Sequence, residues 1–189
     1  NGGQSIGDAW RPIDKAASTA QAGSTVNVVD GNYGNENVVF DYSGTVENHI
    51  VFQAHNGTPT LDGIDAANSK GMYAYQKEYI DIIGFTILDY TSNIYIFVGT
   101  NITVTDCTVY SASSYGCSCQ NSTQILIENV TSYNNGMSGI GFITCNHSTV
   151  NNSEVYGTQA YGISFSSFAV IADGGHNNTA SYNHVHENY

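Results

Sequence analysis

The chain has 189 residues, of which 41% are hydrophobic and 11% are charged, and it is long enough for one domain with a packed core. Four Lys and Arg residues against sixteen Asp and Glu residues give a net charge of −12. This excludes nucleic acid as a partner, because phosphate binding needs a basic surface. No apolar run reaches the ~18 residues of a membrane-spanning helix, so we expect no membrane insertion.

Residues 1–24 are predicted to form an N-terminal cap that contains a short helix. Pro12 suits the first position of a helix, and Gly23 suits the end of one. The apolar stripe of this helix consists of Ile13, Ala16, Ala17 and Ala20. We expect the helix to cover the open end of the structure that follows.

Residues 25–78 are predicted to be irregular entry coils. Strand-like runs cover residues 25–29, 38–42 and 49–53, and clusters of turn-forming residues separate them. The segment Asp62-Gly-Ile-Asp65 places two carboxylates in one turn. With backbone carbonyl groups, Asp62 and Asp65 are a candidate Ca²⁺ site. No other cofactor is expected.

Residues 79–189 are predicted to be regular coils, with an insertion near residues 169–176. Two columns recur at a constant interval and consist of Ile94, Cys117, Ile140 and Ile163, and of Ile96, Cys119, Phe142 and Phe165. Two further inward columns are Ile82, Val104, Ile127, Val150 and Ala180, and Ile87, Val109, Ser132, Val155 and Val185. Residues two apart on a strand share one face, so these columns are predicted core stacks. A period of about 22–23 residues without helical segments indicates a β-solenoid.

Three segments resemble the entry coils of a known superfamily. They are the runs at residues 23–33, 43–52 and 60–63, which are similar to those of right-handed parallel β-helix proteins of the pectate-lyase-like class. That superfamily includes many bacterial and archaeal surface proteins. The resemblance implies an all-β, right-handed, single-stranded parallel β-helix over residues 1–189 as a single domain. It also implies an extracellular or cell-surface location.

The four cysteines are predicted to be buried thiols. Cys117 and Cys119 stand in the apolar columns, and as neighbours two apart on one face they are too far apart for an easy disulfide. A disulfide between Cys145 and Cys119 is an alternative. The Cys-x-Cys spacing lacks the second pair that a zinc site requires.

The residues that polysaccharide chemistry needs are scarce. A polyuronate lyase needs a Brønsted base, usually Lys or Arg. Arg11 and Lys15 lie in the predicted cap, and no Lys or Arg follows Lys77, so Lys70 and Lys77 are the alternative catalytic candidates. A glycosidase needs paired carboxylates, and no column stacks two acids. We therefore predict no catalytic residue in this segment.

Two histidines near the end of the sequence share one face of a predicted strand. His184 and His186 are two positions apart. A metal site would need a third ligand, for which Asp173 or Glu187 are the candidates. We interpret these histidines as polar surface residues.

The outward columns contain possible contact points for glycans. Tyr110, Tyr133 and Tyr156 recur at the interval of the core columns and are a candidate stacking platform for sugars. If the chain is secreted, N-glycosylation is possible at the sequons of Asn56, Asn101, Asn121, Asn146, Asn151 and Asn177.

These observations favour a secreted or cell-surface structural β-helix without catalysis. Its inward columns continue through residues 177–189 without a covering helix, and an uncovered strand edge pairs readily with another chain. Self-association, or a continuation of the same solenoid in a larger assembly, is therefore expected. The alternatives are a polysaccharide-active enzyme, either a pectate-lyase-like lyase or a glycoside hydrolase, and a glycan-binding surface module.

Overall fold

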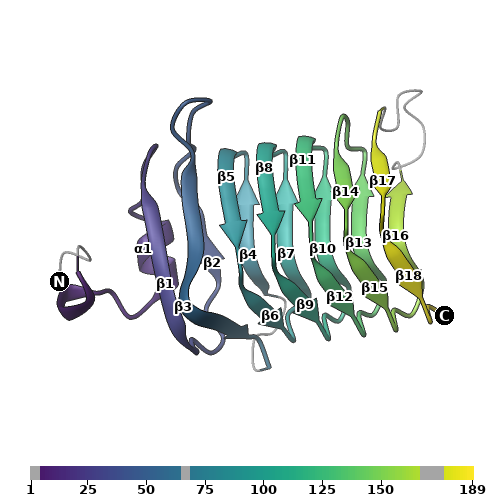
Figure 1. The fold of residues 1–189 in the computed structure, drawn as a ribbon, viewed down its shortest axis with the longest axis horizontal. Helices are drawn as coiled ribbons and strands as arrows, with labels where there is room; N and C mark the ends of the chain where they lie inside the picture. Colours follow the sequence, from purple (N-terminus) through teal and green to yellow (C-terminus); the bar gives the residue numbers. More distant parts are fainter. Residues whose placement is uncertain (1–4, 65–68, 167–176) are drawn as a thin grey trace.

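Strands wind around a common axis in parallel coils, as a computed structural model of the chain shows (Figure 1). The structure describes residues 5–64, 69–166 and 177–189. Every paired strand in these ranges runs parallel to its partner. The predicted all-β parallel β-helix is therefore confirmed. No helix in the described ranges is long and apolar enough to cross a bilayer.

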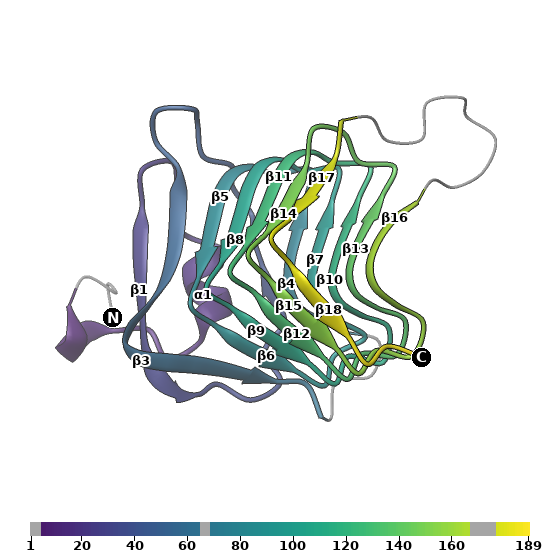
Figure 2. The ribbon, with the colours of Figure 1, turned by 45° about the vertical axis from the view of Figure 1, so that its right-hand side comes forward.

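Equivalent strands of successive coils lie side by side and form three faces of the solenoid (Figure 2). The first face consists of β5 (Glu78–Ile83), β8 (Thr100–Thr105), β11 (Thr123–Glu128), β14 (Thr149–Asn151) and β17 (Thr179–Ser181). The second face consists of β6 (Thr86–Leu88), β9 (Thr108–Tyr110), β12 (Thr131–Tyr133), β15 (Glu154–Tyr156) and β18 (His184–His186). The third face consists of β2 (Val38–Val39), β4 (Lys70–Tyr75), β7 (Ser92–Phe97), β10 (Tyr115–Gln120), β13 (Ser138–Ile143) and β16 (Tyr161–Ser166).

The entry coils join the first two faces. Strand β3 (Ile50–Asp62) bends across both faces, pairing with β5 along its first part and with β6 along its last part. Its other edge pairs with β1 (Thr25–Asn32). The runs predicted at residues 25–29 and 49–53 are thus confirmed as strands, both longer than expected, whereas the run at 38–42 forms a strand over Val38–Val39 alone.

The predicted core columns lie in the register of the strands. Ile94, Cys117 and Ile140 are aligned partners on β7, β10 and β13, and each is at most 1% exposed. Phe165 is aligned with Phe142 and stacks on it at a ring-centroid distance of 5.1 Å. It is nevertheless 42% exposed, because β16 has a paired strand on one side alone in the described chain.

The turns between faces explain why the sequence is rich in Asn. Asp106, Asn129 and Asn152 each follow a strand of the first face and adopt φ values of 57°, 51° and 49°. Asn and Asp tolerate this left-handed conformation better than most residues. The Asn129 Nδ2 group also donates to Asp106 Oδ1 at 2.6 Å, so this predicted polar column links neighbouring coils.

Buried serines also tie each coil to the next. Ser122 Oγ accepts a hydrogen bond from the backbone N–H of Gly99 in the previous coil at 3.0 Å. Ser148 and Ser153 make the equivalent bond to backbone N–H groups of the coil before them, each at 3.1 Å. These hydroxyls satisfy buried backbone groups that the short strands leave without a strand partner.

The N-terminal helix is shorter than the sequence predicts. Helix α1 spans Ile13–Ala17 and does not continue to Gly23; a 3₁₀ turn at Ile6–Asp8 precedes it. The hydroxyls of Ser18 and Thr19 donate to the backbone carbonyl of Lys15 at 3.1 Å and 2.8 Å. Such local bonds compete with helix continuation.

A half-buried carboxylate fastens this helix to the coils. Glu36 Oε2 accepts the backbone N–H groups of Ile13 at 2.6 Å and of Asp14 at 3.1 Å. In return, Asp14 Oδ1 accepts the backbone N–H of Val39 in β2 at 3.2 Å. Burial raises the pKa of Glu36, against the lowering effect of the two backbone N–H groups.

All four cysteines are free and buried, so the alternative disulfide is absent. Cys145 Sγ instead donates to the backbone carbonyl of Cys119 at 3.2 Å. Burial raises the pKa of Cys107 to about 12 and that of Cys145 to about 11, and it raises the pKa values of Cys117 and Cys119 as well.

We expect these thiols to be unreactive in the folded protein. The thiolate is the reactive form, and burial disfavours it. A chromogenic disulfide reagent in mildly alkaline buffer should therefore detect no thiol in the native chain and all four after unfolding in guanidinium chloride. Rapid reaction of any thiol in the native protein would contradict the buried columns.

Shortening a core side chain should destabilise the whole solenoid. Ile140 is fully buried, so Ile140→Ala is expected to lower the free energy of unfolding by about 2–5 kcal/mol. The control is Val46→Ala, because Val46 is 72% exposed and its loss should cost less than ~0.5 kcal/mol. Urea titrations followed by circular dichroism compare the two, and equal effects would argue against the core assignment.

Candidate functional site

Four aromatic side chains cover the outer surface of the third face where β4 and β7 lie together. Tyr73 and Tyr75 come from β4, and Tyr95 and Phe97 from β7. They alternate along each strand with residues that point into the core, and the two strands pair in register. We call these four residues the aromatic array.

The rings of the aromatic array are nearly parallel. Between coils, Tyr73 and Tyr95 are 5.4 Å apart and Tyr75 and Phe97 are 5.6 Å apart, with interplanar angles of 16° and 12°. Along each strand the neighbouring centroids are 6.1 Å apart. Tyr75 is 43% exposed, so the array presents an apolar surface to solvent.

Lys70 adds a cationic group to this surface. Its Nζ atom lies 5.0 Å from the ring centroid of Tyr73 and 5.2 Å from that of Tyr95. Both distances are within the range of a cation–π interaction. The two rings therefore hold the ammonium group over the boundary between two coils.

A polar edge extends the array onto the next coil. The Tyr95 hydroxyl donates to Gln120 Oε1 at 3.1 Å, and Gln120 Nε2 donates to Ser118 Oγ at 3.1 Å. Burial raises the pKa of Tyr95, with smaller contributions from Tyr73 and Tyr115. The hydroxyl therefore stays protonated, and it can donate or accept a hydrogen bond.

The two lysines that the sequence suggests do not form one site. Lys70 begins β4 and Lys77 follows the other end of that strand, so roughly 20 Å of extended chain separates them. Lys77 lies at a turn where its backbone carbonyl accepts the N–H of Thr100 at 3.0 Å. Lys70 alone belongs to the aromatic array.

The candidate calcium ligands are only partly described. Asp62 ends β3, whereas Asp65 lies outside the described residues. The carboxylate of Asp89 lies close to that of Asp62. The pKa of Asp89 is raised mainly by burial and, to a smaller extent, by the negative charge of Asp62. Both charges also raise the pKa of Tyr110, after burial. These acids therefore lie at the beginning of the outward tyrosine column.

The predicted tyrosine column is a continuous stack of rings on the second face. Tyr110 and Tyr133 are 4.6 Å apart, Tyr133 and Tyr156 are 5.1 Å apart, and His186 continues the stack at 5.1 Å. The interplanar angles are 5°, 4° and 14°. We call these four residues the tyrosine ladder.

Stacking within the tyrosine ladder limits how it can contact a sugar. A sugar stacks on the face of an aromatic ring, and here neighbouring rings cover each other's faces. Ring edges and hydroxyl groups are what such a stack presents outward. The glycan platform expected at Tyr110, Tyr133 and Tyr156 therefore stays a prediction, with hydrogen bonding rather than ring stacking as its chemistry.

Sequence reasoning overlooked the aromatic array. Tyr73 is the aligned partner of Tyr95, and Tyr75 is the aligned partner of Phe97, so both pairs follow the interval of the first regular coils. The repeat of aromatic residues was present in the sequence, but Tyr73 and Tyr75 precede residue 79 and so lie in the segment that was predicted to be irregular coils.

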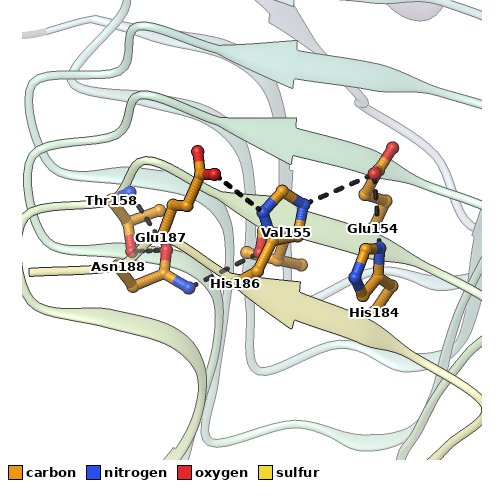
Figure 3. A network of polar contacts seen from close by, with 7 residues as sticks. All are labelled: Glu154, Val155, Thr158, His184, His186, Glu187 and Asn188. Carbon is orange, nitrogen blue, oxygen red and sulfur yellow. Dashed lines mark hydrogen bonds and ion pairs between the residues drawn. The ribbon is translucent and has the colours of Figure 1, made fainter.

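The two histidines of β18 do gain a third partner. Glu154 on β15 is the aligned neighbour of His184, and its carboxylate faces one nitrogen of each imidazole (Figure 3). Glu154, His184 and His186 offer ligand atoms that lie within 4.8 Å of one another. Of the ligands suggested by sequence, Glu187 lies beside His186, and Asp173 falls outside the described residues.

The candidate N-glycosylation sites differ in exposure. The exposed asparagines are Asn56, Asn121 and Asn177, and the half-buried ones are Asn101, Asn146 and Asn151. Asn151 Nδ2 donates to Glu128 Oε1 at 3.0 Å, an interaction that a glycan on this nitrogen would disturb. Modification of all six stays a prediction.

Residues 1–139 match the family described as Pel9A-like, right handed beta helix region. The match covers more than half of the sequence, and the chain therefore belongs to this family of right-handed β-helices. No curated protein sequence matches the chain.

Two solved structures share the fold at low sequence identity. The crystal structure of pectate lyase Pel9A is 17% identical, with a TM-score of 0.66 over 93% of this chain and 54% of that one. An alginate lyase from Paenibacillus sp. str. FPU-7 is 13% identical, with a TM-score of 0.69 over 93% of this chain and 72% of that one. The chain thus spans about half the length of Pel9A, and these likenesses show the fold.

Removing one ring from the tyrosine ladder should cost stability through two lost stacking contacts. Each aromatic pair contributes about 0.5–1.5 kcal/mol, so Tyr133→Ala is expected to destabilise the fold by about 1–3 kcal/mol. Tyr133→Phe keeps the ring and should stay within ~0.5 kcal/mol of the wild type. Urea unfolding measures both variants.

The control for that pair is Tyr161→Ala, which removes a side chain that is 65% exposed. If Tyr133→Ala and Tyr161→Ala were equally mild, the stacked geometry of the ladder would be refuted.

Proposed function

We propose that this chain binds an acidic polysaccharide, a polymer of uronate sugars, on the aromatic array of the third face. The observation that carries this proposal is the position of Lys70, whose ammonium group lies over the rings of Tyr73 and Tyr95. The rings of the array also stack on one another, so their outward edges provide the apolar contact to a sugar ring, and the ammonium group pairs with the carboxylate of the sugar.

Lys70 places a positive charge on the aromatic array of a chain that is otherwise strongly acidic. The chain has a net charge of −12, and no Lys or Arg follows residue 77. A polyanion is repelled by most of such a surface. Lys70 provides a local positive charge next to an exposed apolar side chain, that of Tyr75, and a uronate sugar carries both a carboxylate and apolar C–H groups.

Family membership supports a polysaccharide ligand. Two solved proteins of the same fold are named for the cleavage of pectate and alginate. Because the chain covers 54% of Pel9A, the activity of the whole protein is itself a proposal. We assign to the present chain the binding of the polymer.

A lyase is the second candidate function, with Lys70 as the Brønsted base. The two named neighbours favour it. The immediate surroundings of Lys70 favour binding instead: ring faces attract the ammonium cation, whereas a base must be the uncharged amine. Lys77 lies away from the aromatic array and is not part of this alternative.

This proposal replaces the structural β-helix that the sequence favoured as the main function. An extracellular or cell-surface location fits a polysaccharide ligand, and we keep it as part of the proposal. Self-association is compatible with it, because β17 and β18 of the first two faces are distant from the aromatic array in the order of the strands.

Replacing Lys70 should weaken polyuronate binding selectively. Lys70→Gln removes a charge-assisted contact worth about 1.5–3 kcal/mol, so a loss of roughly tenfold or more in affinity for polygalacturonate is expected. Lys77→Gln is the matched control and should bind as the wild type does. Isothermal titration calorimetry with uronate oligosaccharides measures the affinity, and rising salt concentration should weaken it.

Two results would count against the proposal. One is equal binding of a neutral glucan and a polyuronate by the wild type; the other is an equal effect of the two lysine substitutions. A parallel measurement of ultraviolet absorbance by unsaturated uronates separates the candidates, because cleavage that Lys70→Gln abolishes would establish the lyase.

A further inference from the structure

Three potential metal ligands converge on the outer surface of the second face. In the register of β15 and β18, Glu154 is aligned with His184, and Tyr156 with His186. The side chains of His184 and His186 share the outward side of β18, and the Glu154 carboxylate approaches both from the previous coil (Figure 3). We propose that Glu154, His184 and His186 form a binding site for a divalent transition-metal ion such as Zn²⁺.

The distances suit coordination better than hydrogen bonding. His184 Nδ1 and His186 Nε2 each lie 3.5 Å from the same carboxylate oxygen, Glu154 Oε1. Good N–H···O hydrogen bonds are about 2.7–3.2 Å long. Ligand atoms bound to Zn²⁺ at about 2.0–2.1 Å with tetrahedral angles are roughly 3.4 Å apart. The two distances to Glu154 already match such a geometry, the two histidine nitrogens lie within 4.8 Å of each other, and binding requires the imidazoles, which stack at a centroid distance of 4.3 Å, to turn toward the ion.

One buried atom of this cluster makes no hydrogen bond. His186 Nε2 is buried and makes no hydrogen bond in the described structure. An unpaired buried polar atom is unfavourable, and coordination of a metal ion would satisfy it.

The other nitrogen of His186 faces a second carboxylate. His186 Nδ1 lies 3.9 Å from Glu187 Oε1. Metal-binding imidazoles usually direct their second nitrogen toward a carboxylate or carbonyl, which holds the proton there and leaves the first nitrogen as the ligand. After a small side-chain adjustment, Glu187 can hold the proton on Nδ1 of His186, which leaves Nε2 as the metal ligand.

The ligand types indicate which metal ion fits. Two imidazole nitrogens and one carboxylate oxygen suit Zn²⁺ and neighbouring first-row ions, whereas Ca²⁺ and Mg²⁺ prefer sites made of oxygen ligands. Three protein ligands leave at least one position for water or an external ligand. Partial exposure of the cluster, with the Glu154 side chain at 47% and that of His184 at 73%, gives an ion access to it.

The proposed site has a defined place on the molecule. His186 stacks on Tyr156 at 5.1 Å, so the metal ion would lie at one end of the tyrosine ladder. The aromatic array is on a different face. The inference therefore does not depend on polysaccharide binding, and each can fail while the other holds.

Titration of the metal-free chain with Co²⁺ and Zn²⁺ tests the site. We expect one ion per chain, visible as d–d absorption bands of bound Co²⁺ that Zn²⁺ displaces. Each of Glu154→Gln, His184→Gln and His186→Gln should weaken binding roughly tenfold or more, and Glu187→Gln by a smaller factor. His55→Gln is the control, because His55 is exposed on β3 at the other end of the solenoid.

Binding should also weaken in acid, because the imidazoles must be unprotonated to hold a metal ion. Circular dichroism checks the fold of each variant; His184→Gln and Glu154→Gln alter exposed side chains, so they keep the test valid if His186→Gln does not fold. Affinity weaker than about 1 mM, or binding that these substitutions leave unchanged, would overturn the inference and leave the cluster as an ion pair without a metal.

Discussion

Everything in this molecule depends on each coil returning to register with the coil before it. Parallel strands share hydrogen bonds only where each coil brings its strand back beside the equivalent strand of the coil before it. Asn and Asp residues in the left-handed backbone conformation, such as Asn129, allow the tight turns between the faces. Buried hydroxyls, such as that of Ser122, then satisfy backbone groups between coils. The high content of small polar residues is therefore a requirement of the fold.

The same register creates the functional groups on the outer surface. Equivalent positions of successive coils lie one above another, so like side chains become ladders and unlike ones become mixed clusters. Lys70 is held by rings from two coils, and Glu154 meets histidines from the next coil. Neither site is contained in a single strand. A β-helix of this kind can thus acquire a binding surface through a few substitutions on neighbouring coils while its core columns stay unchanged.

The period of the sequence was sufficient to predict the interior but not all of the exterior. Ile94 and Cys117 were placed correctly because the same interval repeats there without interruption. Glu154 was missed as a partner of His184 although the predicted column that aligns Val155 with Val185 implies this pair, because the candidate third ligands were taken from the last coil alone. The early end of helix α1 depends on competing hydroxyl bonds to the backbone, which helical spacing alone does not reveal.

A crystal structure of the chain with a bound uronate oligosaccharide would test the central claim most directly. The account predicts sugar rings lying across the aromatic array, with one carboxylate oxygen about 2.7–2.9 Å from Lys70 Nζ. An oligosaccharide bound on the second face along the tyrosine ladder, or on the first face, with the aromatic array bare, would contradict it.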